Sequence, residues 1–308
     1  MQNNFQNEIQ DFDETLDISE LFTVIWKRKI FITIFTLIIA ISSVLYSLSL
    51  PNLYTSKVLL VPSENKNSLS SSLGAYSGIA GIAGINLPGG GDNLSEEAMA
   101  RIMSFDFFNK YFLPNIQLEN LLAVDKWNRN INTLTYIEDS FNSDTKTWVR
   151  KVKPPKSLVP SAQEAFKQYK LAVTVNEDKK NQFVNISVTH KSPYIAKKWN
   201  DVIVSKINKS MRLETQKRAE ESILFLNETY SSTKKDVIKN AVSDLIETQM
   251  QTLMLSSVSP DYVYKTIDSA IVPEIKSSPN RALICIVLTL IGGFVSIFLA
   301  IFLHYYKN

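Results

Sequence analysis

Two long runs of apolar residues, Ile30–Leu50 and Ala282–Tyr305, lie near the two ends of the chain. A helix needs roughly 20 residues to cross a hydrocarbon core of about 30 Å, so each run is long enough to span a membrane. The pattern divides the chain into an N-terminal tail (1–29), a first span (30–50), a large middle segment (51–281), a second span (282–305) and a short C-terminal end (306–308).

The flank of the first apolar run predicts its orientation. Trp26, Lys27, Arg28 and Lys29 directly precede the run, and basic residues stay on the cytoplasmic side while tryptophan favours the headgroup region. We therefore expect both termini in the cytoplasm and the middle segment in the periplasm, in a two-span inner-membrane protein. A cleaved signal peptide is disfavoured, because the apolar run is long and the residues before the basic triplet are acidic. The helical spacing over Leu16–Trp26 predicts a short interfacial helix.

Strand and helix patterns both occur in the middle segment. Apolar alternation predicts strands over Tyr54–Val61 and Tyr262–Ile271, and paired strands over Leu171–Asn176 and Phe183–Thr189. A helix is expected to open at Ser95 and run to about residue 111, with acidic residues at its N-terminal end. The fold class predicted is α+β: two membrane helices flanking a periplasmic α/β base domain.

A long helical pattern occupies residues 194–259, where the chain has neither proline nor glycine. Apolar residues recur at helical spacing, which predicts long helices over about residues 193–257. Sixty helical residues would extend on the order of 90 Å. Because the apolar stripe is narrow and polar residues dominate 212–218, such helices should project as an arm and contact neighbouring copies of the chain.

Glycine is concentrated in one stretch. Seven of the nine glycines lie between Gly74 and Gly91, and the other two are Gly292 and Gly293 in the second span. The spacing lacks the lysine–hydroxyl pair of a phosphate-binding loop and differs from the dinucleotide fingerprint. An apolar loop that packs against neighbouring subunits is the favoured interpretation. A Lys-Pro stretch at 151–160 is interpreted as an extended surface linker.

Residues that could support catalysis are sparse. The two histidines, His190 and His304, are far apart in the sequence, and the single cysteine lies in the second span. The adjacent acidic pairs Glu138–Asp139 and Glu220–Glu221 do not face each other on a helix or strand, so neither suits acid–base work. We therefore expect no catalytic, cofactor-binding or metal site, and no nucleic-acid partner. The formal net charge of +3 is modest and favours a mixed, solvated surface over a site for an anionic glycan.

Several segments together resemble the chain-length determinant (Wzz-type) family, the polysaccharide co-polymerases without a kinase domain. The most specific segment precedes the second span, where Ala270, Pro273, Pro279 and Arg281 match and Lys276 replaces a frequent proline. The other matching segments are Asp17–Phe22, Trp26–Lys29, Gly78–Ile85, Val188–His190 with Pro193 and Ala196, Ile246–Gln249 and Ile267–Ala270.

The resemblance implies a periplasmic α/β base with a long helical arm and a closed homo-oligomer. It also implies control of the modal length of O-antigen or a similar polymer, together with an inner-membrane polymerase and in contact with the growing glycan. Pro273 and Pro279 lack N–H groups and have a fixed φ, so they should form a stiff connector. Gly292 and Gly293 permit close helix approach to the first span, to a sister subunit or to another protein.

Three other functions remain open from the sequence. The chain could be the membrane adaptor or activator of a separate tyrosine kinase in capsule or exopolysaccharide export, although Lys307 and Asn308 form only a short C-terminal tail. A periplasmic sensor would need an output domain, and a glycan-processing enzyme would need a catalytic pair.

Overall fold

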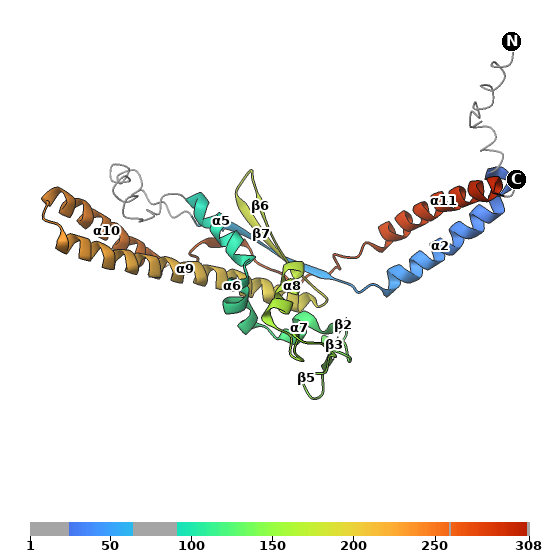
Figure 1. Cartoon of the computed structure of the whole chain (residues 1–308), viewed down its shortest axis with the longest axis horizontal. Helices are drawn as coiled ribbons and strands as arrows, with labels where there is room; N and C mark the ends of the chain where they lie inside the picture. Colours follow the sequence, from blue (N-terminus) through green and yellow to red (C-terminus); the bar gives the residue numbers. More distant parts are fainter. Residues whose placement is uncertain (1–24, 64–90, 259, 307–308) are drawn as a thin grey trace, which may run out of the picture. The chain divides into compact units, whose positions relative to one another are not determined.

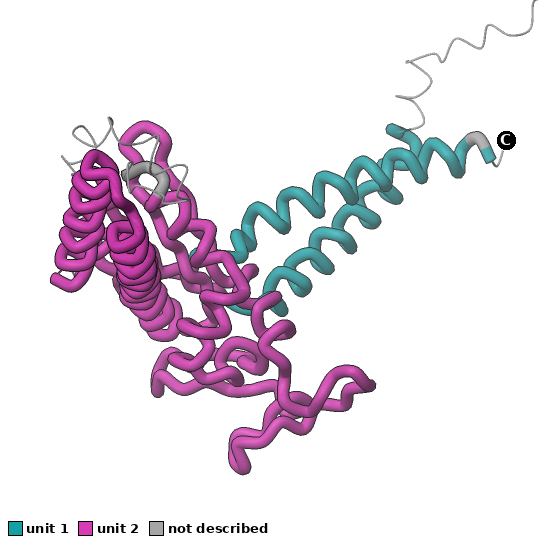
Figure 2. Tube along the Cα trace, turned by 60° about the vertical axis from the view of Figure 1, so that its left-hand side comes forward, with its two compact units in different colours: residues 1–52, 277–308 teal, residues 53–276 magenta. Residues whose placement is uncertain are grey.

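The computed structural model describes residues 25–63, 91–258 and 260–306 and divides into two units (Figures 1 and 2). Unit 1 combines residues 1–52 with 277–308, and unit 2 consists of residues 53–276. Most of the predicted helix at residues 16–26 and most of the glycine-rich stretch lie outside the described residues. Each unit is described by itself below.

Unit 1 is a pair of apolar helices, α2 (Lys29–Ser49) and α11 (Arg281–Tyr305). Both are long and apolar enough to cross a membrane. Asn280 caps α11, since its Oδ1 accepts a hydrogen bond from the backbone N–H of Leu283 (3.3 Å). The large apolar side chains on the outer faces of both helices are exposed, as expected for surfaces that contact lipid.

A four-stranded antiparallel sheet forms the centre of unit 2, in the order β6-β7-β1-β8. The strands are β1 (Tyr54–Pro62), β6 (Val173–Asp178), β7 (Phe183–His190) and β8 (Tyr264–Asp268). All four strands were predicted from the sequence, and β6 and β7 pair as expected. Strand β6 starts two residues later than predicted because the preceding residues finish a helix, α8 (Ala162–Ala172).

One face of helix α9 (Pro193–Ser232) packs against this sheet and completes the core. The buried residues of α9 include Trp199, Ile203, Ile207 and Met211, spaced three or four residues apart as one helical face requires. They contact the inward positions of the strands, where burial alternates along β7. Burial of this stripe places the start of α9 in the base domain and leaves its later turns outside the core.

Two buried asparagines fasten α9 to the sheet by hydrogen bonds. Asn200 Nδ2 donates to the carbonyl oxygens of Ser56 and Ile186, both at 3.1 Å. Asn208 Oδ1 accepts from the backbone N–H groups of Val263 and Tyr264, both at 2.9 Å, and its Nδ2 donates to the carbonyl of Tyr264. Because buried polar groups need partners, these contacts fix the rotation of α9 as well as its depth.

The predicted helix from Ser95 to residue 111 is divided into several pieces. Helix α5 (Gly91–Ile102) ends where Ser104 caps the short α6 (Phe105–Phe107) by accepting a hydrogen bond from the N–H of Phe107. A π-helical turn (Phe108–Phe112), a 3₁₀ turn (Leu113–Asn115) and α7 (Leu118–Leu122) follow. The division arises because Ser104 offers the chain a local capping bond in place of the next helical one.

Residues 124–148 contain two small hairpins that the sequence analysis did not predict. Strand β2 (Val124–Asn128) pairs with β3 (Thr133–Tyr136), and β4 (Phe141–Asn142) pairs with β5 (Thr147–Trp148). The strands are only two to five residues long, too short for a clear alternating pattern. The Lys-Pro stretch that follows is irregular, and Arg150 holds it by donating to the carbonyls of Ser157 (2.7 Å) and Leu158 (2.8 Å).

The long helical segment folds back on itself as an arm of two helices (Figure 1). Helix α9 ends at Ser232, and α10 (Asp236–Val258) returns alongside it. Leu226 of α9 and Ala241 and Leu245 of α10 are buried along the arm. The long helices predicted over about residues 193–257 are therefore present as two, and the 40 residues of α9 reach about 60 Å rather than the roughly 90 Å of sixty helical residues in line. Helix α10 supplies part of the packing that we expected only from neighbouring copies.

Candidate functional site: the paired apolar helices and the charged node of the base

Helices α2 and α11 pack along a seam of small and hydroxyl-bearing residues. Gly292, Ser296 and Ala300 recur every four residues on α11, and Ser43 and Ser47 do so on α2, which places each set on one helical face. These positions are buried, whereas most neighbouring apolar side chains are exposed. Small residues allow two helix backbones to approach closely in a membrane, so the seam explains how this pair forms.

Gly292 and Gly293 differ sharply in their surroundings. A Cβ added at Gly292 would lie 2.6 Å from Cγ2 of Ile39, closer than atoms can approach without a shift. A Cβ added at Gly293 would meet no atom within 4 Å. The first glycine is therefore part of the contact between the two helices of one chain, and the second leaves a notch that no described residue fills.

Hydroxyl groups also meet across the seam. Thr36 Oγ1 lies 3.3 Å from Ser296 Oγ, while Ser296 donates to the carbonyl of Gly293 (2.7 Å) and Thr36 to that of Ile32 (2.8 Å). In an apolar solvent these hydroxyls need partners, which the helix carbonyls supply. Either hydroxyl can also donate to the other across the seam in place of its helix carbonyl, so the two polar groups satisfy each other within the helix pair.

Two arginines each connect the start of one helix to the end of the other. Arg28, just before α2, donates to the carbonyl of Leu303 in the last turn of α11 (3.2 Å). Arg281, the first residue of α11, donates to the carbonyl of Leu50, which ends α2 (3.3 Å), and to Oδ1 of Asn52 (3.2 Å). A helix C-terminus carries unpaired carbonyls and partial negative charge, so a cation there is stabilising.

The other sequence-predicted residues fall into different places. Trp26 is exposed, and the Nζ of Lys29 lies 4.9 Å from the centroid of its ring. Ala270 is buried in the core of unit 2, and Pro273 belongs to the same unit. Pro279 and Arg281 belong to unit 1.

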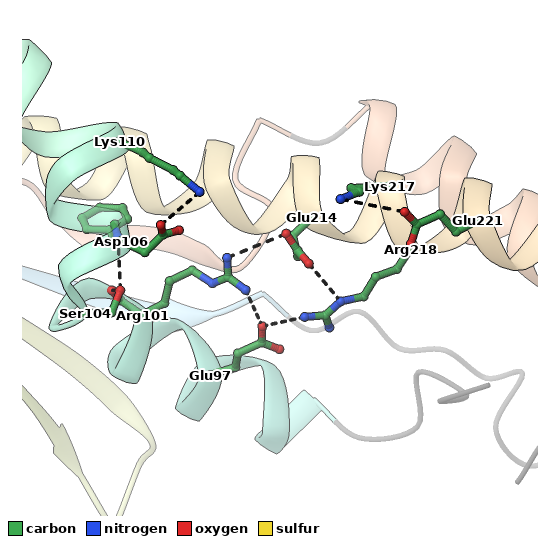
Figure 3. A network of polar contacts seen from close by, with 10 residues as sticks. Glu97, Arg101, Ser104, Asp106, Lys110, Glu214, Lys217, Arg218 and Glu221 are labelled. Carbon is green, nitrogen blue, oxygen red and sulfur yellow. Dashed lines mark hydrogen bonds and ion pairs between the residues drawn. The ribbon is translucent and has the colours of Figure 1, made fainter. Parts of the chain in front are cut away.

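A node of four charged side chains links α5 to α9 (Figure 3). Glu97 Oε1 accepts from Arg101 (2.8 Å) and from Arg218 (3.1 Å), and Arg218 also pairs with Glu214 (3.4 Å). Burial alone would raise the pKa of Glu97, but the hydrogen bonds from both arginines outweigh this effect and lower it. The node connects the start of the base to the root of the arm, a link that no local sequence pattern indicates.

His190 is a buried structural residue at the end of β7. Its Nδ1 accepts from the N–H of Ser192 (2.9 Å), so its Nε2 carries the proton and donates to the carbonyl of Asn120 (2.8 Å). Burial lowers the pKa of His190, against the smaller opposing effect of these backbone bonds. Both ring nitrogens therefore already take part in hydrogen bonds. Within the described residues, no group of three or more His, Cys, Asp and Glu side chains could hold a metal.

These features define a class of protein: two apolar helices pair by a small-residue seam and flank an α/β unit that carries a helical arm. Residues 14–107 match the family model described as Wzz, chain length determinant protein. This match confirms the resemblance seen in the sequence, and it relates the chain to that family through its first third. No curated protein is significantly similar to the chain.

Two solved structures are similar in outline. A full-length bacterial polysaccharide co-polymerase matches with a TM-score of 0.39 and 13% identity over 95% of this chain and 99% of that chain. A fragment of WzzB, a polysaccharide co-polymerase from Salmonella Typhimurium, matches with a TM-score of 0.32 and 14% identity over 74% of this chain and 100% of that chain.

Sequence reasoning missed several residues of the helix seam. Thr36, Ile39 and Ser296 were not predicted as contact residues. Arg28 was assigned a role in membrane orientation, and Arg281 was assigned to the motif that precedes the second span. The four-residue spacing of Gly292, Ser296 and Ala300 was the signal that could have found the seam. Arg28 and Leu303 are 275 positions apart in the sequence and meet only in the folded chain, so no local sequence pattern indicates this contact.

Proposed function

We propose that the protein is a non-enzymatic regulator of the chain length of a surface polysaccharide, O-antigen or a similar polymer. The observation that carries this proposal is the match of residues 14–107 to the chain length determinant family. The paired apolar helices and the α/β unit with its helical arm fit such a scaffold. The protein holds the growing glycan or its polymerase in place by geometry, and the polymerase performs the chemistry.

We place the helix pair in the inner membrane with both termini in the cytoplasm and unit 2 in the periplasm. The basic triplet Lys27–Lys29 supports this orientation. A cysteine placed at the exposed Ser231 should react with a membrane-impermeant maleimide in intact cells whose outer membrane is permeabilised. Labelling only after the inner membrane is broken would contradict the orientation. Cys285→Ser removes the other thiol.

The arm supports assembly into a homo-oligomer. Met250, Met254 and Val258 recur every four residues on α10 and are between 49% and 80% exposed within one chain. A stripe of apolar side chains on one helical face is typical of a surface that another protein covers. The residues of the same arm that face α9, such as Leu245, are already buried.

Size measurement of the detergent-solubilised protein tests this assembly. Met254→Glu places a charge in the exposed stripe and should shift the particle toward monomers. Asn227→Glu adds the same charge at an exposed position of α9 and should leave the assembly intact. A wild-type particle that is a stable monomer would contradict the scaffold.

Gly293 is our candidate contact for a helix of the polymerase. Ile39 packs against Gly292, whereas the position of Gly293 is open, so a second membrane helix can approach the backbone of α11 closely at Gly293. Gly293→Leu should change the length distribution of the polymer without unfolding the helix pair. An unchanged distribution would remove Gly293 from the contact.

Deletion of the gene tests the function itself. Polysaccharide from the deletion strain, separated by gel electrophoresis, should lose its modal length distribution, and the wild-type gene supplied in trans should restore it. An unchanged distribution would refute the proposal. The Met254→Glu and Asn227→Glu variants, supplied in the same way, would show whether regulation requires assembly.

A further inference from the structure

Three aromatic rings meet at one end of the central sheet of unit 2. Trp127 of β2 stands edge-on to Tyr54 of β1, with centroids 5.4 Å apart, and lies 6.2 Å from Tyr194 in the first turn of α9. Tyr194 is half exposed, and Tyr54 and Trp127 are partly exposed. The three rings come from three separate elements and form one aromatic platform, defined here as Tyr54, Trp127 and Tyr194.

The tryptophan of this platform is held in a fixed orientation. Its Nε1 donates to Oδ1 of Asn132 (2.8 Å), across the tip of the β2–β3 hairpin. Asn132 has a φ of 49°, a left-handed conformation that asparagine tolerates better than most residues. The hairpin itself is tied to the sheet end, because Lys191 Nζ donates to the carbonyl of Val124 (2.6 Å). A ring fixed in this way loses little freedom when a ligand stacks on it.

Polar groups lie exposed around the platform, although Asn128 Oδ1 already accepts a hydrogen bond from the N–H of Asn130 (2.9 Å). Neither Tyr54 nor Tyr194 forms a hydrogen bond through its hydroxyl with any residue that the structure describes. The hairpin tip beside Trp127 exposes Asn128, Arg129 and Asn130. Amides donate and accept hydrogen bonds, phenols do both, and guanidinium groups donate.

We propose that this platform is a binding site for a glycan chain. The apolar C–H face of a sugar ring packs on an aromatic ring, while its hydroxyls require a mixture of donors and acceptors close by. The platform supplies both, in the arrangement of an apolar ring with a polar tip that favours wet interfaces. This inference rests on the proposed function and goes further, because it assigns the surface by which the protein contacts the polymer.

Binding measurements on the full-length protein in detergent test the site. The probe is the polysaccharide released by mild acid from the expressing cells, and its binding is followed by saturation-transfer NMR and calorimetry. Tyr194→Ala should weaken binding of the polysaccharide at least about fivefold. Tyr194→Phe should weaken it less, because phenylalanine retains the aromatic ring and lacks only the hydroxyl. Tyr230→Ala removes a comparably exposed tyrosine of the arm, 41% exposed, and should bind as the wild type does.

Each outcome decides for or against the site. Equal binding by wild type, Tyr194→Ala and Tyr230→Ala would overturn it, and so would loss of binding in both alanine variants. Binding of a proline-rich peptide in place of the polysaccharide would also overturn it, since aromatic clusters take extended proline helices too. If Tyr194→Ala unfolds, Tyr194→Leu, which keeps an apolar side chain but has no aromatic ring, must show the loss. Binding that persists when gene deletion leaves polymer length unchanged would retain the site and refute the proposed function.

Discussion

Gly292 of α11 packs directly on Ile39 of α2, so closely that a single added carbon would come within 2.6 Å of the isoleucine side chain. We predict that Gly292→Leu separates the two helices and lowers the stability of the pair by about 1–3 kcal/mol, the usual cost of overpacking. Thermal unfolding of the detergent-solubilised protein would measure this. Gly293→Leu, next to it, should have little effect on the pair, and equal losses in both variants would contradict the packing.

The reciprocal arginine contacts predict two separate losses of stability. Arg28→Gln and Arg281→Gln should each lower stability by about 1 kcal/mol, since a cation at a helix C-terminus contributes 0.3–1 kcal/mol and more where it is partly buried. The two contacts lie at opposite ends of the helix pair, so the losses should add in the double variant. Lys27→Gln is the matched control, because Lys27 is exposed and forms no hydrogen bond or ion pair with any residue that the structure describes. A loss in Lys27→Gln equal to that in Arg28→Gln would contradict the specific contact.

Asn208 should be one of the most sensitive polar positions in unit 2. Its side chain makes three hydrogen bonds to Val263 and Tyr264, at the start of β8, and is 4% exposed. Asn208→Ala leaves the backbone N–H groups of Val263 and Tyr264 without a partner and should cost about 2–4 kcal/mol. Chemical denaturation would show this cost, and Asn227→Ala, an exposed asparagine on the same helix, should cost much less. A loss below about 1 kcal/mol at Asn208 would mean that water replaces the side chain.

His190 predicts a pH dependence of stability. Burial lowers its pKa in the folded protein, whereas the unfolded chain has a value near 6.5. The unfolded state therefore binds the proton first, and the contribution of His190 is complete above about pH 6.5 and is lost as the pH falls toward the lowered value. His190→Gln should be less stable than wild type at pH 8, and the difference should shrink by pH 5. A constant difference between the two proteins would show that the histidine does not titrate in this way.

The sequence predicted the elements that have a clear period or length. The apolar runs, β1, β7 and the helical pattern after Pro193 were found because each has many residues and one burial pattern. The hairpins β2–β3 and β4–β5 were missed because two to five residues give no reliable alternation. The reversal at Thr233–Lys235 was missed because no proline or glycine marks it, and α10 packs back along α9 only in the folded chain.

The site was less predictable than the fold. Glycine at positions 292 and 293 indicated close helix contact, but only the structure separates the filled position from the open one. The node of Glu97 and Arg218 joins residues 121 positions apart, and the aromatic platform joins three segments. Such contacts depend on tertiary packing and leave no trace in local composition.

In each unit, the two elements next to the connecting segments pair with each other, and this pairing has a mechanical consequence. Strands β1 and β8 are hydrogen-bonded to each other, and helices α2 and α11 pack on each other. Strand β1 follows α2, and β8 precedes α11, so two connectors run between two pairs of adjacent ends. A turn of the helix pair about its own axis would wind one connector around the other, whereas a single connector could swivel freely. Two connectors in place of one therefore limit how far either unit can be rotated before the connectors cross.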